Sequence, residues 1–70
     1  MSNTSNLIGK EFIYIPTGII YIIYSVREYP NGNHKIYLEN VENSDEQITE
    51  SFETLSNNDI WEENRKNSKY

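Results

Sequence analysis

The stretch IIYIIYSVREYPNGNHKIYLENV, residues 19–41, decides the fold. Two segments rich in Ile, Val and Tyr flank the turn residues Pro30-Asn31-Gly32-Asn33. Asn-Gly between two such segments favours a tight hairpin, because both residues tolerate positive φ. We therefore expect strands over residues 19–29 and 34–41.

The first of these strands carries apolar side chains on both faces. A strand of this kind is central in its sheet, curled into a barrel, or covered by a partner. Residues 10–15, KEFIYI, favour another strand, and residues 16–18, Pro-Thr-Gly, a turn. Residues 10–41 thus predict a three-stranded antiparallel meander. By alternation the faces of the long strand divide into two sets: Ile20, Ile22, Tyr24 and Val26 against Ile19, Tyr21 and Ile23.

Residues 44–55 admit two interpretations. Ser44 with Gln47 three residues later has the spacing of a helix capping box. Alternatively, residues 47–51 form a fourth strand and a short helical turn follows near residues 52–55. We favour the strand, because a small barrel needs a further strand to cover IIYIIY. Both interpretations bury Ile48, Phe52 and Leu55.

The expected fold class is therefore mainly β. It is either a small SH3-like barrel or a three- to four-stranded antiparallel meander with a short helix after residue 44. We expect a flexible N-terminus over residues 1–8, one small domain over 9–62 whose end Ile60 and Trp61 plug, and a flexible polar tail over 63–70. The layout resembles SH3-like barrels, a fold that hosts many functions and decides none.

Composition argues against catalysis. The chain of 70 residues has no cysteine and one histidine, so thiolate and multi-histidine metal sites are excluded. Its three glycines are scattered singly, which leaves no phosphate-binding loop. The residues around Asp45 lack the spacing and the central glycine of a calcium loop, and His34 falls in the predicted hairpin. We expect no enzyme activity, no cofactor and no metal.

A membrane location is not expected either. The longest apolar run, IIYIIY, is far shorter than the roughly 20 residues that a membrane-spanning helix needs. The first residues, MSNTSNLIGKEF, lack the charged start and long apolar run of a secretory signal. We therefore expect a soluble, cytoplasmic protein.

The charges are strongly segregated along the chain. Residues 1–38 have a net charge of +1, residues 39–63 carry nine acids and no base, and residues 64–70 have a net charge of +3. Like charges repel and destabilise the compact state, and ordinary surfaces mix both signs. The block is either a solvated face that aids solubility or a surface for a basic partner. The candidate partner-binding residues are Glu39, Glu42, Asp45, Glu46, Glu50, Glu53, Asp59, Glu62 and Glu63.

Proteins that bind nucleic acid present the most abundant basic surfaces in a bacterial cell. Along an extended strand, residues i and i+2 lie roughly 6.6 Å apart, so carboxylates at such intervals can imitate a row of phosphates. Four asparagines among the acids offer further polar contacts, and electrostatic steering would make the association fast and salt-sensitive. These asparagines are Asn40, Asn43, Asn57 and Asn58.

The chain resembles the small acidic host-takeover proteins of bacteriophages, including those that mimic DNA. The shared features are its length, its many Asn and Ile residues, the absence of Cys and the acidic block from Glu39 to Glu63. The resemblance implies a non-enzymatic inhibitor in the host cytoplasm that occupies the nucleic-acid-binding surface of a basic host protein. A histone-like nucleoid protein is our first expectation for that partner.

Two alternatives remain open. IIYIIY can leave an apolar strip that favours a homodimer, a homo-oligomeric assembly or an SH3-like adaptor that docks protein partners. A module that binds nucleic acid or a peptide through Tyr21, Tyr24 or Tyr37 is less favoured. Phosphate contacts need several Lys or Arg residues, and residues 1–63 contain only three. We expect no direct binding of nucleic acid.

Overall fold

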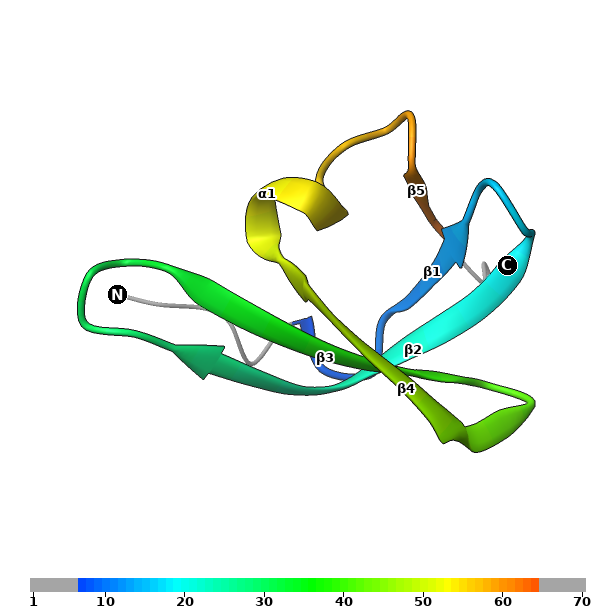
Figure 1. Cartoon of the computed structure of the whole chain (residues 1–70), viewed down its shortest axis with the longest axis horizontal. Coiled ribbons are helices and arrows are strands. Elements are labelled where there is room, and N and C mark those ends of the chain that lie inside the picture. The colour runs from blue at the N-terminus through cyan, green and yellow to red at the C-terminus, as the bar shows by residue number, and fades with distance from the viewer. Residues whose placement is uncertain (1–6, 65–70) are drawn as a thin grey trace, which may run out of the picture.

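Residues 7–64 are described by the structure, a computed structural model; the predicted flexible ends lie mostly outside this range. The described chain forms one open antiparallel sheet of five strands in the order β4-β3-β2-β1-β5, with one short helix (Figure 1). The mainly β prediction is confirmed, with five strands rather than three or four. The elements are β1 (Glu11–Tyr14), β2 (Ile19–Glu28), β3 (His34–Asn40), β4 (Asn43–Ser51), α1 (Phe52–Leu55) and β5 (Trp61–Glu63).

The predicted hairpin joins β2 to β3. The carbonyl of Tyr29 accepts a hydrogen bond from the Gly32 amide at 2.9 Å, and the Tyr29 amide donates to the Asn33 carbonyl at 2.9 Å. Gly32 has a φ of 91°, which a residue with a side chain rarely adopts. A turn followed by a glycine of positive φ is typical of three-residue hairpin loops. Pro30 supplies the fixed φ that the first position of such a turn prefers.

The favoured interpretation of residues 44–55 is confirmed, and the capping box at Ser44 is not formed. Ile48 on β4 pairs with the buried Leu38 on β3. A helix that began at Ser44 would have left Leu38 without this cross-strand neighbour. The helix α1 begins only after Ser51, whose hydroxyl oxygen accepts a hydrogen bond from the Thr54 amide at 3.1 Å.

A β-bulge changes the faces of β2. Ile23 pairs with Leu38 and Ser25 pairs with Tyr37, which leaves Tyr24 as an extra residue. Val26 therefore turns toward the core, where it packs against buried residues, and Tyr24 is 39% exposed. The prediction that Val26 shares a face with Ile20, Ile22 and Tyr24 is wrong for this reason.

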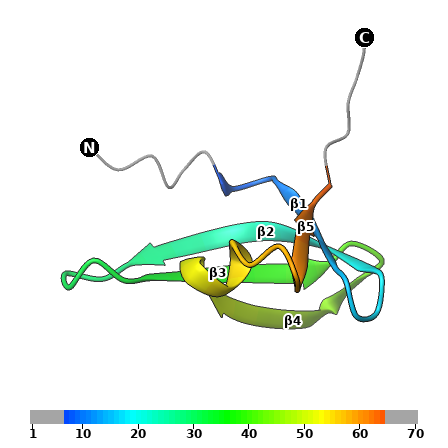
Figure 2. The same cartoon turned by 90° about the horizontal axis from the view of Figure 1, so that it is seen from above.

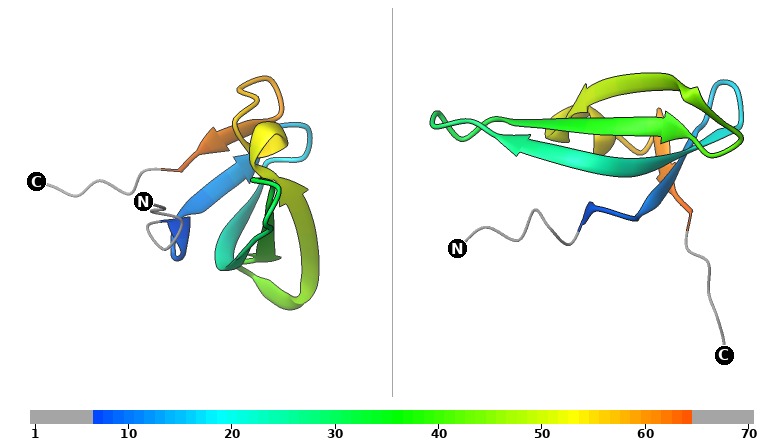
Figure 3. Two further views of the ribbon diagram at one scale, coloured as in Figure 1. Left: turned by 90° about the vertical axis from the view of Figure 1, so that its left-hand side faces the viewer. Right: turned by 90° about the horizontal axis from the view of Figure 1, so that it is seen from below.

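The core lies on one face of the bent sheet, which we call the inner face. Figures 1 to 3 show that β1, β5 and α1 lie on the same side of the three long strands. Trp61 is 1% exposed, and its ring centroid lies 5.0 Å from that of Tyr14 and 5.7 Å from that of Tyr21. The buried residues are Tyr21, Ile23, Ile36, Leu38, Leu55 and Trp61.

Two details differ from the sequence-based expectations. Phe52 is 49% exposed rather than buried, because α1 has a single turn and its first residue lies beyond the core, with its ring 6.0 Å from that of His34. Leu7 packs against the core, and the Asn64 amide donates to the Glu11 carbonyl at 2.8 Å. The packed unit therefore extends at both ends beyond residues 9–62.

The two faces of β2 predict different costs for neighbouring isoleucines. Ile23 is buried on the inner face, whereas Ile22 lies on the opposite, outer face between Glu11 and Glu39. We expect Ile23→Ala to lower the free energy of unfolding by about 2–5 kcal/mol, and Ile22→Ala to lower it by less than half as much. Urea unfolding followed by Trp61 fluorescence measures both. If Ile23→Ala does not fold, Ile23→Val and Ile22→Val provide the same comparison, and equal costs would contradict the assigned faces.

Candidate partner-binding surface

The nine predicted acids do not form one continuous row. Alternation along the strands places Glu39 and Glu62 on the outer face of the sheet, because their cross-strand partners Ile22 and Ile13 lie outside the core. Three others face inward, and four lie on a turn, an exposed strand end, a helix or a loop. The inward set is Glu46, Glu50 and Glu63, and the last set is Glu42, Asp45, Glu53 and Asp59.

Two of the inward carboxylates have partners within the chain. Glu46 accepts hydrogen bonds from the Tyr21 hydroxyl and from Nδ2 of Asn40, both at 3.1 Å. Burial, and secondly this bond to Glu46, raises the pKa of the Tyr21 hydroxyl above its ordinary value. Glu63 forms an ion pair with Lys10 at 3.2 Å. These two charges serve the fold and contribute little to a surface for a partner.

Glu50 is different, because it is partly buried without a partner. It lies opposite Ile36 on the inner side of β4, and no described residue donates a hydrogen bond to its carboxylate. Burial raises the pKa of Glu50 above its ordinary value, because a desolvated carboxylate holds its proton more tightly.

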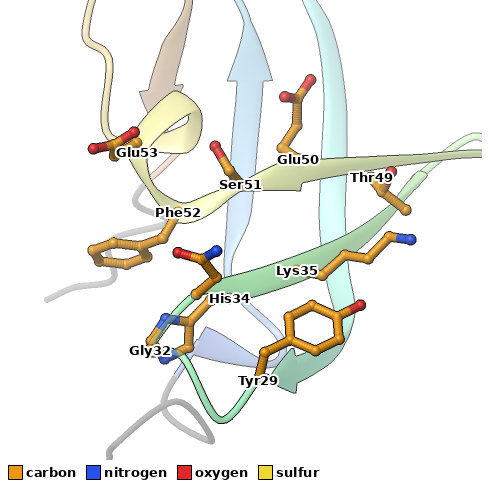
Figure 4. A pocket seen from close by; sticks show the side chains of 10 residues that line it. Tyr29, Gly32, His34, Lys35, Thr49, Glu50, Ser51, Phe52 and Glu53 are labelled. Carbon is orange, nitrogen blue, oxygen red and sulfur yellow. The ribbon is translucent and has the colours of Figure 1, made fainter.

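Glu50 also lines a pocket of about 700 Å³ between the start of β3 and the end of β4 (Figure 4). The pocket contains Ser51 and His34, the residue types of a nucleophile and a base, but the geometry does not pair them. The Ser51 hydroxyl is engaged with Thr54, and Nε2 of His34 lies 3.6 Å from the Glu28 carboxylate. No three His, Asp or Glu side chains within residues 7–64 are placed to hold a metal ion.

Asparagines position three of the exposed acids. The Oδ1 atoms of the asparagines two residues earlier accept the backbone N–H of Glu42 at 2.9 Å, of Asp45 at 3.2 Å and of Asp59 at 3.0 Å. Such Asx turns fix the backbone of a loop. These asparagines, expected from the sequence to offer further polar contacts, thus hold the backbone that carries the acids. The asparagines are Asn40, Asn43 and Asn57.

Most of the negative charge of residues 7–64 has no compensating group among those residues. Residues 7–64 contain eleven carboxylates and three Lys or Arg side chains, a net charge of −8. Among the described residues, no hydrogen bond or ion pair reaches the carboxylates of seven of the nine predicted acids: Glu50 on the inner side of β4, and six that lie on the outer face, a turn, a strand end, the helix or a loop. These six, which we call the free acids, are Glu39, Glu42, Asp45, Glu53, Asp59 and Glu62.

One further acid, which is not part of the acidic block in the sequence, lies near the free acid Glu39. Glu11 on β1 pairs with Ile22, which in turn pairs with Glu39, so two carboxylates flank one isoleucine on the outer face. Glu11 also accepts a hydrogen bond from Nδ2 of Asn64 at 3.0 Å. Alternation along residues 10–15 was the signal that could have placed Glu11 outside, but it lies far from the acidic block in sequence.

Comparison of the chain with protein-family models, with curated proteins and with solved structures found no match. Within residues 7–64, the helix is too short to cross a membrane.

The position of Glu50 predicts a pH-dependent stability. A carboxylate with a raised pKa in the folded state favours folding while it is protonated, and this contribution is lost as the pH rises above the ordinary pKa of glutamate. We expect Glu50→Gln to be more stable than the wild type at about pH 7, with a difference that shrinks at about pH 4. Urea unfolding at both values measures this.

Glu42→Gln is the matched control, because it makes the same change of charge at an exposed turn. It should change the stability less than Glu50→Gln at neutral pH. A Glu50→Gln variant that is less stable than the wild type at neutral pH would mean that the carboxylate has a stabilising partner, and would contradict the assignment of Glu50 as a desolvated carboxylate.

Proposed function

We propose that the protein is a non-enzymatic inhibitor that binds a basic, nucleic-acid-binding protein through its free acids. The observation that carries the proposal is the set of six carboxylates without partners on a chain whose described residues have a net charge of −8. Uncompensated charge of one sign costs stability through self-repulsion. A partner of the opposite charge relieves that repulsion. The attraction between the two charged surfaces strengthens the binding and speeds the association.

The arrangement of the free acids supports electrostatic mimicry in a particular form. The acids of the turn between β3 and β4 and of the loop before β5 sit on backbone fixed by Asx turns, so a partner would order few loop residues on binding. The loop and the turn lie apart in Figure 1. A partner that bound both would follow the surface of the molecule, as it would follow the curved backbone of DNA.

A histone-like nucleoid protein is the first partner to test, because it is abundant and broadly basic. The proposal includes the bacteriophage origin that the sequence features suggested, and competition with DNA is its decisive property. A solvated face that serves only solubility would bind no particular protein and would show no such competition.

The test is a pull-down from a bacterial lysate with the tagged protein, eluted by a salt gradient. We expect a nucleic-acid-binding protein to elute at moderate salt, and added DNA to displace it. Two neutralised variants, E42Q/D45N and E53Q/E62Q, should each weaken the retention, with a lower salt concentration needed for elution.

The control variant N33K/S56K changes the net charge by the same two units at exposed positions outside the free acids. Weaker retention in the neutralised variants but not in the control would locate binding at the carboxylates. Equal effects in all three would show that only net charge matters. The proposal fails if the wild type retains no nucleic-acid-binding protein, or one that DNA does not displace.

A further inference from the structure

The outer face of β3 carries a cation, an aromatic ring and an anion in a row. Lys35, Tyr37 and Glu39 alternate with the buried Ile36 and Leu38, so all three point away from the core. The tyrosine is in the middle, with a positive charge two residues before it and a negative charge two residues after it. Successive members of this set, which we call the β3 triplet, lie roughly 6.6 Å apart along the strand.

A second cation lies beside the positive end of the β3 triplet. Arg27 lies directly opposite Lys35 on the neighbouring strand β2, an arrangement that is destabilising for like charges. Although residues 7–64 contain eleven carboxylates, none of them forms an ion pair with Arg27 or Lys35. Two adjacent cations that have no ion pair among the described residues can accept negative groups from another molecule.

The centre of the triplet is aromatic. The ring of Tyr37 lies 6.1 Å from that of Tyr24, which also lies outside the core, and Nζ of Lys35 is 5.6 Å from the centroid of the Tyr37 ring. Ile22 lies on the same face beside Glu39. The outer face thus combines an aromatic and apolar centre with opposite charges at its two ends, and none of the described elements covers it.

We propose that two copies of the chain pack these outer faces together about a two-fold axis. The axis passes near Tyr37, lies between the two sheets and parallel to them, and is perpendicular to β3. In this arrangement the two β3 strands run in opposite directions. Lys35 of each copy meets Glu39 of the other, and the two Tyr37 side chains meet at the axis. The interface is isologous, as in most homodimers.

Charge selects this arrangement from the other two-fold packing of the same faces. An axis parallel to the strands would place Lys35 against Lys35 and Glu39 against Glu39, with repulsion at both ends. In the proposed packing, Arg27 adds a second cation near the partner's Glu39. Its aliphatic stem can also cover the partner's Ile22, because the Arg27–Lys35 and Ile22–Glu39 pairs lie on opposite sides of Tyr37.

The proposal does not depend on the proposed function. Of the free acids, only Glu39 belongs to the β3 triplet. Glu42 lies in the turn that follows β3, and Asp45 lies near the start of β4. A basic protein seated on the outer face is the rival occupant. It would meet Arg27 and Lys35 with like charge, which is why a second copy is the better fit.

Charge exchange tests the dimer directly by sedimentation velocity of the full chain over a wide range of concentrations. We expect the wild type to dimerise, and Lys35→Glu and Glu39→Lys each to raise the dissociation constant about tenfold or more, since each places like charges at both ends of the interface. An equimolar mixture of the two variants should form a heterodimer, because each triplet end then meets its opposite. The double variant K35E/E39K should dimerise more tightly than either single variant, although less tightly than the wild type, because Arg27 then lies near a cation at position 39 of the other copy.

Glu62→Lys is the control, because it makes the same change of charge on the outer face of β5, away from the triplet. Tryptophan fluorescence of each variant reports whether the chain is folded, and the double variant keeps the test valid if one single variant unfolds. A wild type that is monomeric at every concentration overturns the proposal. So does a dimer that both single variants leave intact, or a mixture of folded variants that remains monomeric.

Discussion

One extra residue in β2 determines which face of the sheet receives each of the β2 side chains that follow it. Without the bulge at Tyr24, regular alternation would continue from Ile23 through residue 25, so Ser25 and Arg27 would face the core and Val26 would face solvent. Because Tyr24 is left out of the pairing, Val26 packs inside and Arg27 lies outside, opposite Lys35. A bulge also bends the strand that carries it. It thereby helps β1 and β5 to lie on the same side of the three long strands as α1 (Figure 3).

The sequence was informative wherever a local pattern had a single interpretation. Pro30 to Asn33 marked the hairpin, and the β-branched residues around it marked the strands. The sequence did not mark the bulge. Residues 19–24 and residue 26 are all apolar or aromatic, so a change in which of them face inward does not alter the apolar pattern. Phe52 was misplaced for a related reason, since its spacing to Leu55 fits a buried helical stripe but says nothing about where a one-turn helix ends.

The candidate site was predictable in composition but not in arrangement. A block of nine acids is visible in any reading of residues 39–63, whereas their partners are distant in sequence. Glu46 is bound by a tyrosine hydroxyl 25 residues away and Glu63 by a lysine 53 residues away. Neighbouring acids on a strand also point to opposite faces. Charge density along the chain therefore overestimates the charge that one surface can offer, and only pairing across the sheet shows which carboxylates remain free.

The net negative charge of the chain has opposite effects on the binding of a basic partner and on dimerisation. A basic partner is attracted by the negative field of the whole molecule, and salt weakens that attraction because it screens charges beyond roughly 10 Å. A second copy is repelled by the same field, so dimerisation must depend on contacts at close range, where Lys35 meets Glu39 and aromatic surface is buried. Screening relieves the repulsion between the copies more than it weakens these short contacts. Moderate salt therefore shifts the balance from binding of a basic partner toward the dimer.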